Sequence, residues 1–133
     1  MKGELIGKGT YGSVFLGLNA TTGEMVAVKQ VEISRDDDRS KQMMDALNAE
    51  IETLKDLDHS SIVQYLGYER TDTTLSIFLE YVPGGSVGRC LKKHGRFEEC
   101  VIRSLIRQTL DGLAYLHVRG ILHRVGFLST LLT

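Results

Sequence analysis

Three glycines near the start of the chain have the spacing of a loop that binds phosphate groups. Gly7, Gly9 and Gly12 lie in the stretch GKGTYGSV. Because glycine has no Cβ, these positions let backbone N–H groups come close to phosphate oxygens. The residues after Gly12, SVFL, are rich in the β-branched and aromatic types that favour a strand. The pattern predicts a hairpin that covers phosphates, with a purely structural glycine hairpin as the alternative.

A lysine and a glutamate follow at positions from which they could act together on phosphate. Lys29 ends a strand predicted over residues 25–29, so its ammonium could reach beneath the hairpin. The stretch from about residue 41 to residue 57 has apolar residues at helical spacing, and Glu50 lies on it. A carboxylate there could hold Lys29 by a charge-assisted hydrogen bond. Taken singly, an exposed lysine and an exposed helix glutamate remain the simpler interpretations.

The second half of the chain predicts a strand, a turn and two helices. The segment LSIFLEYVPGGS contains an apolar strand that ends at Leu79, a Pro-Gly-Gly breaker, and Ser86 at the place of a helix cap. A longer helix is predicted from about residue 97 to residue 118. The apolar residues on one side of that helix are Val101, Leu105, Leu113 and Leu116.

The order of these segments resembles the eukaryotic protein kinases. The glycine loop, VAVK, the helix glutamate, IVQYLGY, FLEYVPGGS, YLH and ILHR follow one another from about residue 4 to residue 124. Residues 62–87 are most similar to the mitogen-activated protein (MAP) kinase kinase kinases, particularly the fungal cell-wall-integrity branch, whose substrates are protein serines and threonines. The resemblance covers the small lobe and only the beginning of the large lobe.

The resemblance implies an α+β fold with three parts. Residues 1–79 would form a kinase-like small lobe, a five-stranded antiparallel sheet with one helix. Residues 80–85 would form the hinge, and residues 86–133 the first helices of an incomplete large lobe. In such a fold Ile6, Val14 and Ala27 match the apolar residues that sandwich adenine, and Leu79 matches the gatekeeper at the back of the pocket.

The polar part of the implied ATP site comes from the hinge and from the predicted phosphate contacts. The backbone of Glu80 and Val82 would hydrogen-bond the adenine edge. Lys29 would bind the α- and β-phosphates, and Glu50 would orient Lys29. The full implied ATP site is Ile6, Gly7, Gly9, Gly12, Val14, Ala27, Lys29, Glu50, Leu79, Glu80 and Val82.

The sequence departs from the family pattern where catalysis would occur. The position of the catalytic aspartate holds Val125, which cannot accept the proton of a substrate hydroxyl. Phe127 and Thr130 hold the positions of the phosphate-contacting lysine and the magnesium-binding asparagine. No Asp-Phe-Gly occurs in the sequence, and no Asp, Glu or Asn follows Asp111. We therefore expect no intact catalytic residue, no metal site, doubtful magnesium binding and no activity in this chain as it stands.

Composition indicates a globular fragment and gives no reason to expect that it binds nucleic acid or inserts into a membrane. The chain has 133 residues and a formal net charge of −1. It contains no apolar run of membrane-spanning length. Cys90 and Cys100 are expected to be ordinary thiols in a reduced, cytoplasmic setting.

Three interpretations of the function stay open. The chain is part of an active serine/threonine kinase, or a catalytically dead module that binds a nucleotide or a partner, or a product with no stable function. The expected ligand is ATP, and in a complete kinase the protein substrate would be a MAP kinase kinase. We also expect self-association through an exposed apolar face formed by Leu105, Leu113 and Leu116.

Overall fold

The computed structural model describes residues 2–9, 12–33 and 38–122 of the chain. The chain divides into two compact units. The first, which we call the sheet unit, comprises Met1–Leu57 and Gln64–Tyr81. The second, the helical unit, comprises Asp58–Val63 and Val82–Thr133. The sequence-based assignments of Val125, Phe127 and Thr130 lie outside the described residues.

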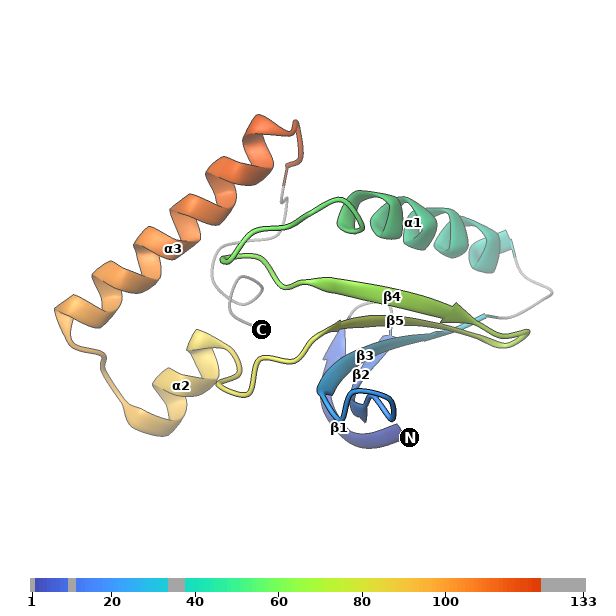
Figure 1. The fold of residues 1–133 in the computed structure, drawn as a ribbon, viewed down its shortest axis with the longest axis horizontal. Helices are drawn as coiled ribbons and strands as arrows, with labels where there is room; N and C mark the ends of the chain where they lie inside the picture. The colour runs from blue at the N-terminus through green and yellow to red at the C-terminus, as the bar shows by residue number, and fades with distance from the viewer. Residues whose placement is uncertain (1, 10–11, 34–37, 123–133) are drawn as a thin grey trace. The chain divides into compact units, whose positions relative to one another are not determined.

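The sheet unit contains five antiparallel strands, as the sequence predicted (Figure 1). Neighbouring strands pair in the order β1-β2-β3-β5-β4. The bounds of the strands are β1 Lys2–Gly9, β2 Gly12–Leu18, β3 Met25–Glu32, β4 Tyr65–Arg70 and β5 Thr74–Glu80. The predicted strand that ended at Lys29 continues to Glu32, because residues up to that point pair with β5.

The core of the sheet unit lies between one face of the sheet and the helix α1, Asp38–Leu54. Val31 of β3 pairs with Leu75 of β5, and both pack with Ile77 and with Ile51 of α1. Leu75 and Ile77 are 1% exposed. Burying a side chain of this size contributes about 1.5–3 kcal/mol, so this contact fixes α1 on the sheet. The helix begins and ends three residues before the predicted bounds.

The helical unit contains α2, Val87–His94, and α3, Glu99–Val118. Ser86 caps α2 as predicted, since its hydroxyl accepts a hydrogen bond of 3.2 Å from the backbone N–H of Arg89. The helix ends at Gly95, whose φ of +79° favours glycine over other residues.

The apolar face expected on α3 is only partly where the sequence placed it. Leu116 is 5% exposed, so its predicted exposure is wrong. Leu105 and Leu113 are half-buried. The exposed apolar residues on α3 are Val101, Ile102, Ile106, Leu110 and Val118. Ile102, Ile106 and Leu110 follow one another at intervals of four and share a helix side, which we call the α3 stripe. Leu105 and Leu116 lie on a different side of the helix.

The two cysteines of the chain form no disulfide in the structure. Cys90 and Cys100 are both free thiols. No helix in the described part of the chain combines the length and the apolar character needed to cross a membrane. No group of three or more metal-ligating side chains that could hold an ion was found within the described ranges.

Candidate functional site

An apolar patch lies on one face of the sheet unit, formed by β2, β3 and β5. Val14 of β2 is paired with Lys29 of β3, and Ala27 is paired with Leu79 of β5. Paired residues share a face, and so do residues two apart along a strand, so all four side chains leave the sheet on the same side. Val14 and Leu79 are half-buried. This arrangement offers apolar surface suited to a flat aromatic ring.

Lys29 connects this patch with the core beneath α1. It is paired with Val14 on one side and with Ile77 of the core on the other. Its side chain is half-buried. A cation is thus held at the border of the apolar patch, which is where a ligand with an aromatic ring and a charged tail would need it. Glu50 belongs to α1, but its side chain is outside the described residues, so its pairing with Lys29 stays a prediction.

Packing in the β1–β2 hairpin requires glycine at position 12 but not at position 7. A Cβ on Gly12 would lie 2.3 Å from the carbonyl oxygen of Gln30 and 3.1 Å from Cγ2 of Val31. The close approach of β2 to β3 therefore requires glycine at this position. Among the described residues, a Cβ on Gly7 would meet Cβ of Val14 alone, at 3.9 Å, which is an ordinary contact. The structural explanation therefore holds for Gly12, and Gly7 has room that a ligand could use.

The other residues of the implied ATP site lie on β1 and at or just after the end of β5. Ile6 lies on β1 where the pairing with β2 shifts register, between Leu5 and Gly7. Gly9 is paired with Gly12. The backbone N–H of Glu80 donates a 2.9 Å hydrogen bond to the carbonyl of Gln64. A ligand contact from the Glu80 backbone would therefore use its carbonyl oxygen. Val82 belongs to the helical unit, and its contact with a ligand stays a prediction.

Among the described residues of the sheet unit, Tyr65 and Lys55 have shifted pKa values. Tyr65 packs against the core, and its burial raises the pKa of the phenol. Lys55 forms an ion pair with Glu52 on the surface, and this hydrogen bond raises the pKa of Lys55. Tyr65 is paired with Leu79 of the apolar patch, so its pKa shift reflects burial beside the patch, whereas the pKa shift of Lys55 arises from its surface ion pair.

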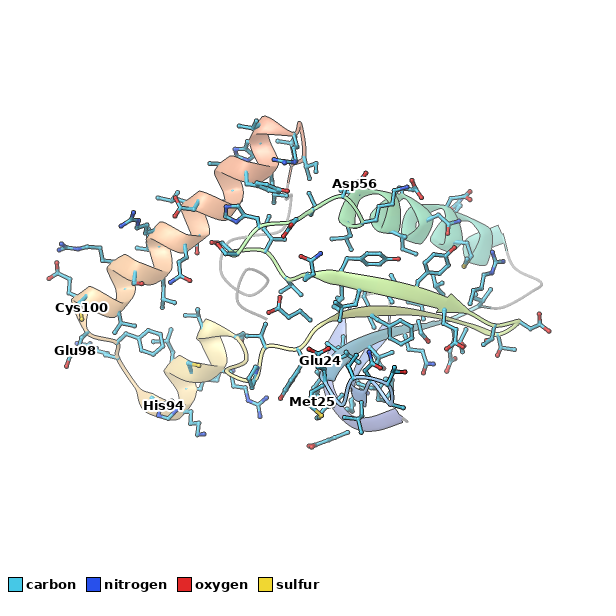
Figure 2. All side chains as sticks on the ribbon, viewed as in Figure 1. Glu24, Met25, Asp56, His94, Glu98 and Cys100 are labelled. Atoms are coloured by element: carbon cyan, nitrogen blue, oxygen red, sulfur yellow. The ribbon has the colours of Figure 1, made fainter. Side chains whose placement is uncertain are left out.

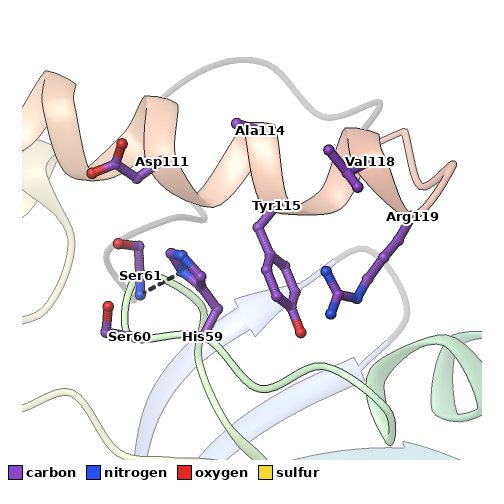
Figure 3. Close-up of a pocket in the computed structure, with 8 residues that line it drawn as sticks. All are labelled: His59, Ser60, Ser61, Asp111, Ala114, Tyr115, Val118 and Arg119. Atoms are coloured by element: carbon purple, nitrogen blue, oxygen red, sulfur yellow. Dashed lines mark hydrogen bonds between the residues drawn. The ribbon is translucent and has the colours of Figure 1, made fainter.

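A second cluster of functional interest lies in the helical unit (Figure 3). The backbone N–H of Asp58 donates a 2.9 Å hydrogen bond to the hydroxyl of Tyr115. The His59 ring is 4.7 Å from the Tyr115 ring between centroids, and the Arg119 guanidinium carbon is 3.6 Å from the centroid of the same ring. The Tyr115 ring lies between these two groups. A hollow of about 460 Å³ opens beside them.

This cluster fixes the segment Asp58–Val63 to α3. His59 Nδ1 accepts a 3.1 Å hydrogen bond from the backbone N–H of Ser61. Ser61 lies so close to the helix that a Cβ on Gly112 would be 3.1 Å from its carbonyl oxygen. These contacts could not be predicted from the sequence, since the hydrogen-bonded residues are 57 positions apart and no local pattern links them.

The comparisons with known proteins agree with the fold. Residues 1–124 match the protein kinase domain family, and the chain belongs to this family. It is 62% identical over 128 residues to the mitogen-activated protein kinase kinase kinase mkh1 of Cytospora mali. It is 60% identical over 129 residues to the MAP kinase kinase kinase mkh1 of Schizosaccharomyces pombe.

These alignments cover most of this chain and a small part of each relative. They include 92% of the chain and 7% of the Cytospora protein, and 93% of the chain and 12% of the Schizosaccharomyces protein. A crystal structure of Rad53 residues 1–466 in complex with AMP-PNP is similar in fold, with a TM-score of 0.77 and 31% sequence identity. That alignment covers 92% of this chain and 31% of the Rad53 chain. The predicted fold class is thereby confirmed.

Proposed function

We propose that this chain is the ATP-binding part of a serine/threonine protein kinase of the MAP kinase kinase kinase type. In the complete kinase, the γ-phosphate of ATP would pass to a serine or threonine of a MAP kinase kinase. The observation that carries the proposal is the common face of Val14, Ala27 and Leu79 with Lys29 at its border. An apolar patch with one adjoining cation suits an adenine ring that bears phosphates.

The separate groups of the site suit separate parts of ATP. The apolar side chains would pack on the adenine ring, and the Glu80 carbonyl would accept a hydrogen bond from the adenine amino group. Lys29 would contact the phosphates by charge-assisted hydrogen bonds. Gly7 would let the hairpin backbone approach them, since its own surroundings leave room for a ligand. No group of three or more His, Cys, Asp or Glu side chains that could hold a metal ion lies in the described part of the chain, and the proposal concerns the contacts of the nucleotide alone.

The second part of the proposal is that this chain binds a nucleotide without transferring phosphate. Val125 stands where the family has the base that accepts the proton of the substrate hydroxyl. A valine side chain has no atom that can do so. The alternative function, a catalytically dead module that binds a nucleotide or a partner, follows from the same residue.

An ATP analogue with a reactive acyl phosphate tests the nucleotide site directly. An amine beside the phosphates attacks the acyl carbon, forms an amide and releases the nucleotide. We expect mass spectrometry to find the label on Lys29, and excess ATP to suppress it. Lys92 and Lys93 of α2 are internal controls for general amine reactivity, since both are exposed and lie outside the proposed site. Labelling of all three lysines at equal rates, insensitive to ATP, would refute the assignment of the site.

A further inference from the structure

The short helix α2 carries a concentration of positive charge on its exposed side. Arg89, Lys92 and Lys93 are all exposed. At 3.6 residues per turn these three positions fall within an arc of about 100°, while the buried Val87 lies on the other side of the helix. We call these three residues the basic face. Arg96, also exposed, follows two residues after the helix.

The first of these cations stands where helix stability favours an acidic residue. Ser86 caps α2, and Arg89 is the third residue after it. In a capping box this position holds glutamate or glutamine, whose side chain bonds back to the N–H of the cap residue. A cation in the first turn is also unfavourable in the field of the helix dipole. The first turn of α2 contains no acidic residue, so nothing local offsets Arg89.

The cations of the basic face also repel one another. Arg89 and Lys92 are three residues apart, and Arg89 and Lys93 are four apart, so both pairs are neighbours on the helix surface. Like-charge pairs at such spacing cost about 0.2–0.5 kcal/mol each. In the same unit, by contrast, Arg103 of α3 forms an ion pair of 2.6 Å with Glu99.

No acidic residue is available nearby in the sequence to neutralise the basic face. Between Glu80 and Glu98 the chain contains neither Asp nor Glu. Figure 2 shows His94 at the end of α2 and Glu98 across the connection at the start of α3. The whole chain has a net charge of −1, so the positive charge is a local feature of α2.

Helix stability alone explains only part of this pattern. Lys92 and Lys93 lie in the last turn, where cations interact favourably with the helix dipole. This explanation fails for Arg89 in the first turn. Several exposed residues that lower the stability of the same helix are typical of a functional surface.

We propose that the basic face of α2 docks an acidic segment of another protein, rich in aspartate and glutamate. Two of its three cations are lysines, which act as separate point charges rather than as planar forks for phosphate. They span about 6 Å along the helix axis, which suits successive carboxylates on one peptide. α2 contains no Phe, Tyr or Trp on which a nucleic acid base could stack. This inference does not depend on nucleotide binding.

Binding of a labelled peptide to the full chain tests the proposal. The probe is a short fluorescein-labelled peptide of alternating aspartate and glycine, and the uncharged control replaces aspartate with asparagine. We expect fluorescence anisotropy to show saturable binding of the acidic peptide only, weakening as salt is raised. Lys92→Gln/Lys93→Gln should weaken binding about tenfold. The matched control Arg103→Gln/Arg107→Gln, with the same change of charge in the same unit, should leave the affinity within about twofold.

Substitution of Arg89 separates binding from folding. Arg89→Glu completes the capping box and removes both like-charge pairs, so we expect a higher melting temperature together with weaker peptide binding. Equal loss of binding in the α2 and α3 double variants would overturn the proposal, because the attraction would then be general. Tighter binding of a DNA oligonucleotide or of phosphatidylserine vesicles than of the peptide would also overturn it, as would unchanged peptide affinity in Arg89→Glu.

Discussion

The hydroxyl of Tyr115 accepts a 2.9 Å hydrogen bond from the backbone N–H of Asp58, 57 positions earlier in the chain. This contact ties the segment Asp58–Val63 to α3 within the helical unit. The segment connects α1 with β4 of the sheet unit. The chain therefore enters the helical unit twice, and the Tyr115 hydroxyl is one of the contacts that hold the early passage.

Removing this hydroxyl should loosen the segment without unfolding the chain. We expect Tyr115→Phe to cost about 0.5–1.5 kcal/mol, the usual net contribution of a hydrogen bond. Amide hydrogen exchange should accelerate at Asp58. Tyr68→Phe is the matched control, since Tyr68 is 56% exposed and forms no such contact among the described residues. Unchanged exchange at Asp58 in Tyr115→Phe would show that the hydrogen bond does not hold the segment.

The two hairpin glycines should respond to alanine in opposite ways. Gly12→Ala places a methyl group 2.3 Å from the carbonyl oxygen of Gln30, so we expect a loss of about 1–3 kcal/mol through overpacking. Gly7→Ala has room and should leave urea unfolding within about 0.5 kcal/mol. It should nevertheless weaken nucleotide binding. A Gly7→Ala variant as unstable as Gly12→Ala would remove the argument for a ligand role of Gly7.

The α3 stripe should govern self-association of the chain. Ile106 and Leu110 are 51% and 59% exposed, so Ile106→Lys and Leu110→Lys should reduce association without loss of folded protein. Leu116→Ala, at a buried position, should instead destabilise by about 2–5 kcal/mol. Sedimentation velocity measures the association and urea unfolding measures the stability. Association that persists in the double lysine variant would exclude the stripe as the contact surface.

Restoring one carboxylate should not restore catalysis. General-base catalysis typically contributes about 10²–10⁴-fold, whereas phosphoryl transfer depends mainly on positioning and on metal ions. We therefore expect Val125→Asp to transfer no labelled phosphate to a generic protein substrate. Val125→Asp combined with Lys29→Met controls for contaminating kinases. Robust transfer that requires Lys29 would contradict the proposed lack of catalysis.

Part of the fold could be predicted because its signals are local. The β-branched and aromatic residues after Gly12, the apolar strand before the Pro-Gly-Gly breaker and the cap at Ser86 each report on a few neighbouring residues, and the structure has the corresponding strands and helix start. The order of the motifs then supplied the family, which no single motif could do. The pairing of Val14 with Lys29 and of Ala27 with Leu79 follows from that fold.

The features that the sequence missed depend on contacts between distant residues. The exposure of Leu116 was predicted wrongly because we expected this face of α3 to lack the cover of downstream helices, whereas Leu116 is buried in this chain. The Tyr115 cluster joins residues on α3 to a segment more than fifty positions earlier, and nothing in either segment specifies the other. Likewise, the spacing of glycines could not separate Gly12, which packing against β3 requires, from Gly7, which packing leaves open.

A nucleotide titration followed by NMR tests the central claim most directly, because it detects weak binding and locates it. We expect ATP to shift the backbone resonances of residues near the patch, Gly7, Val14, Ala27, Lys29 and Glu80, with α3 unaffected. The affinity should be weaker than micromolar, and Lys29→Met should abolish the shifts, since Lys29 is the cation at the patch. Shifts confined to the helical unit, or shifts unchanged in Lys29→Met, would contradict the account.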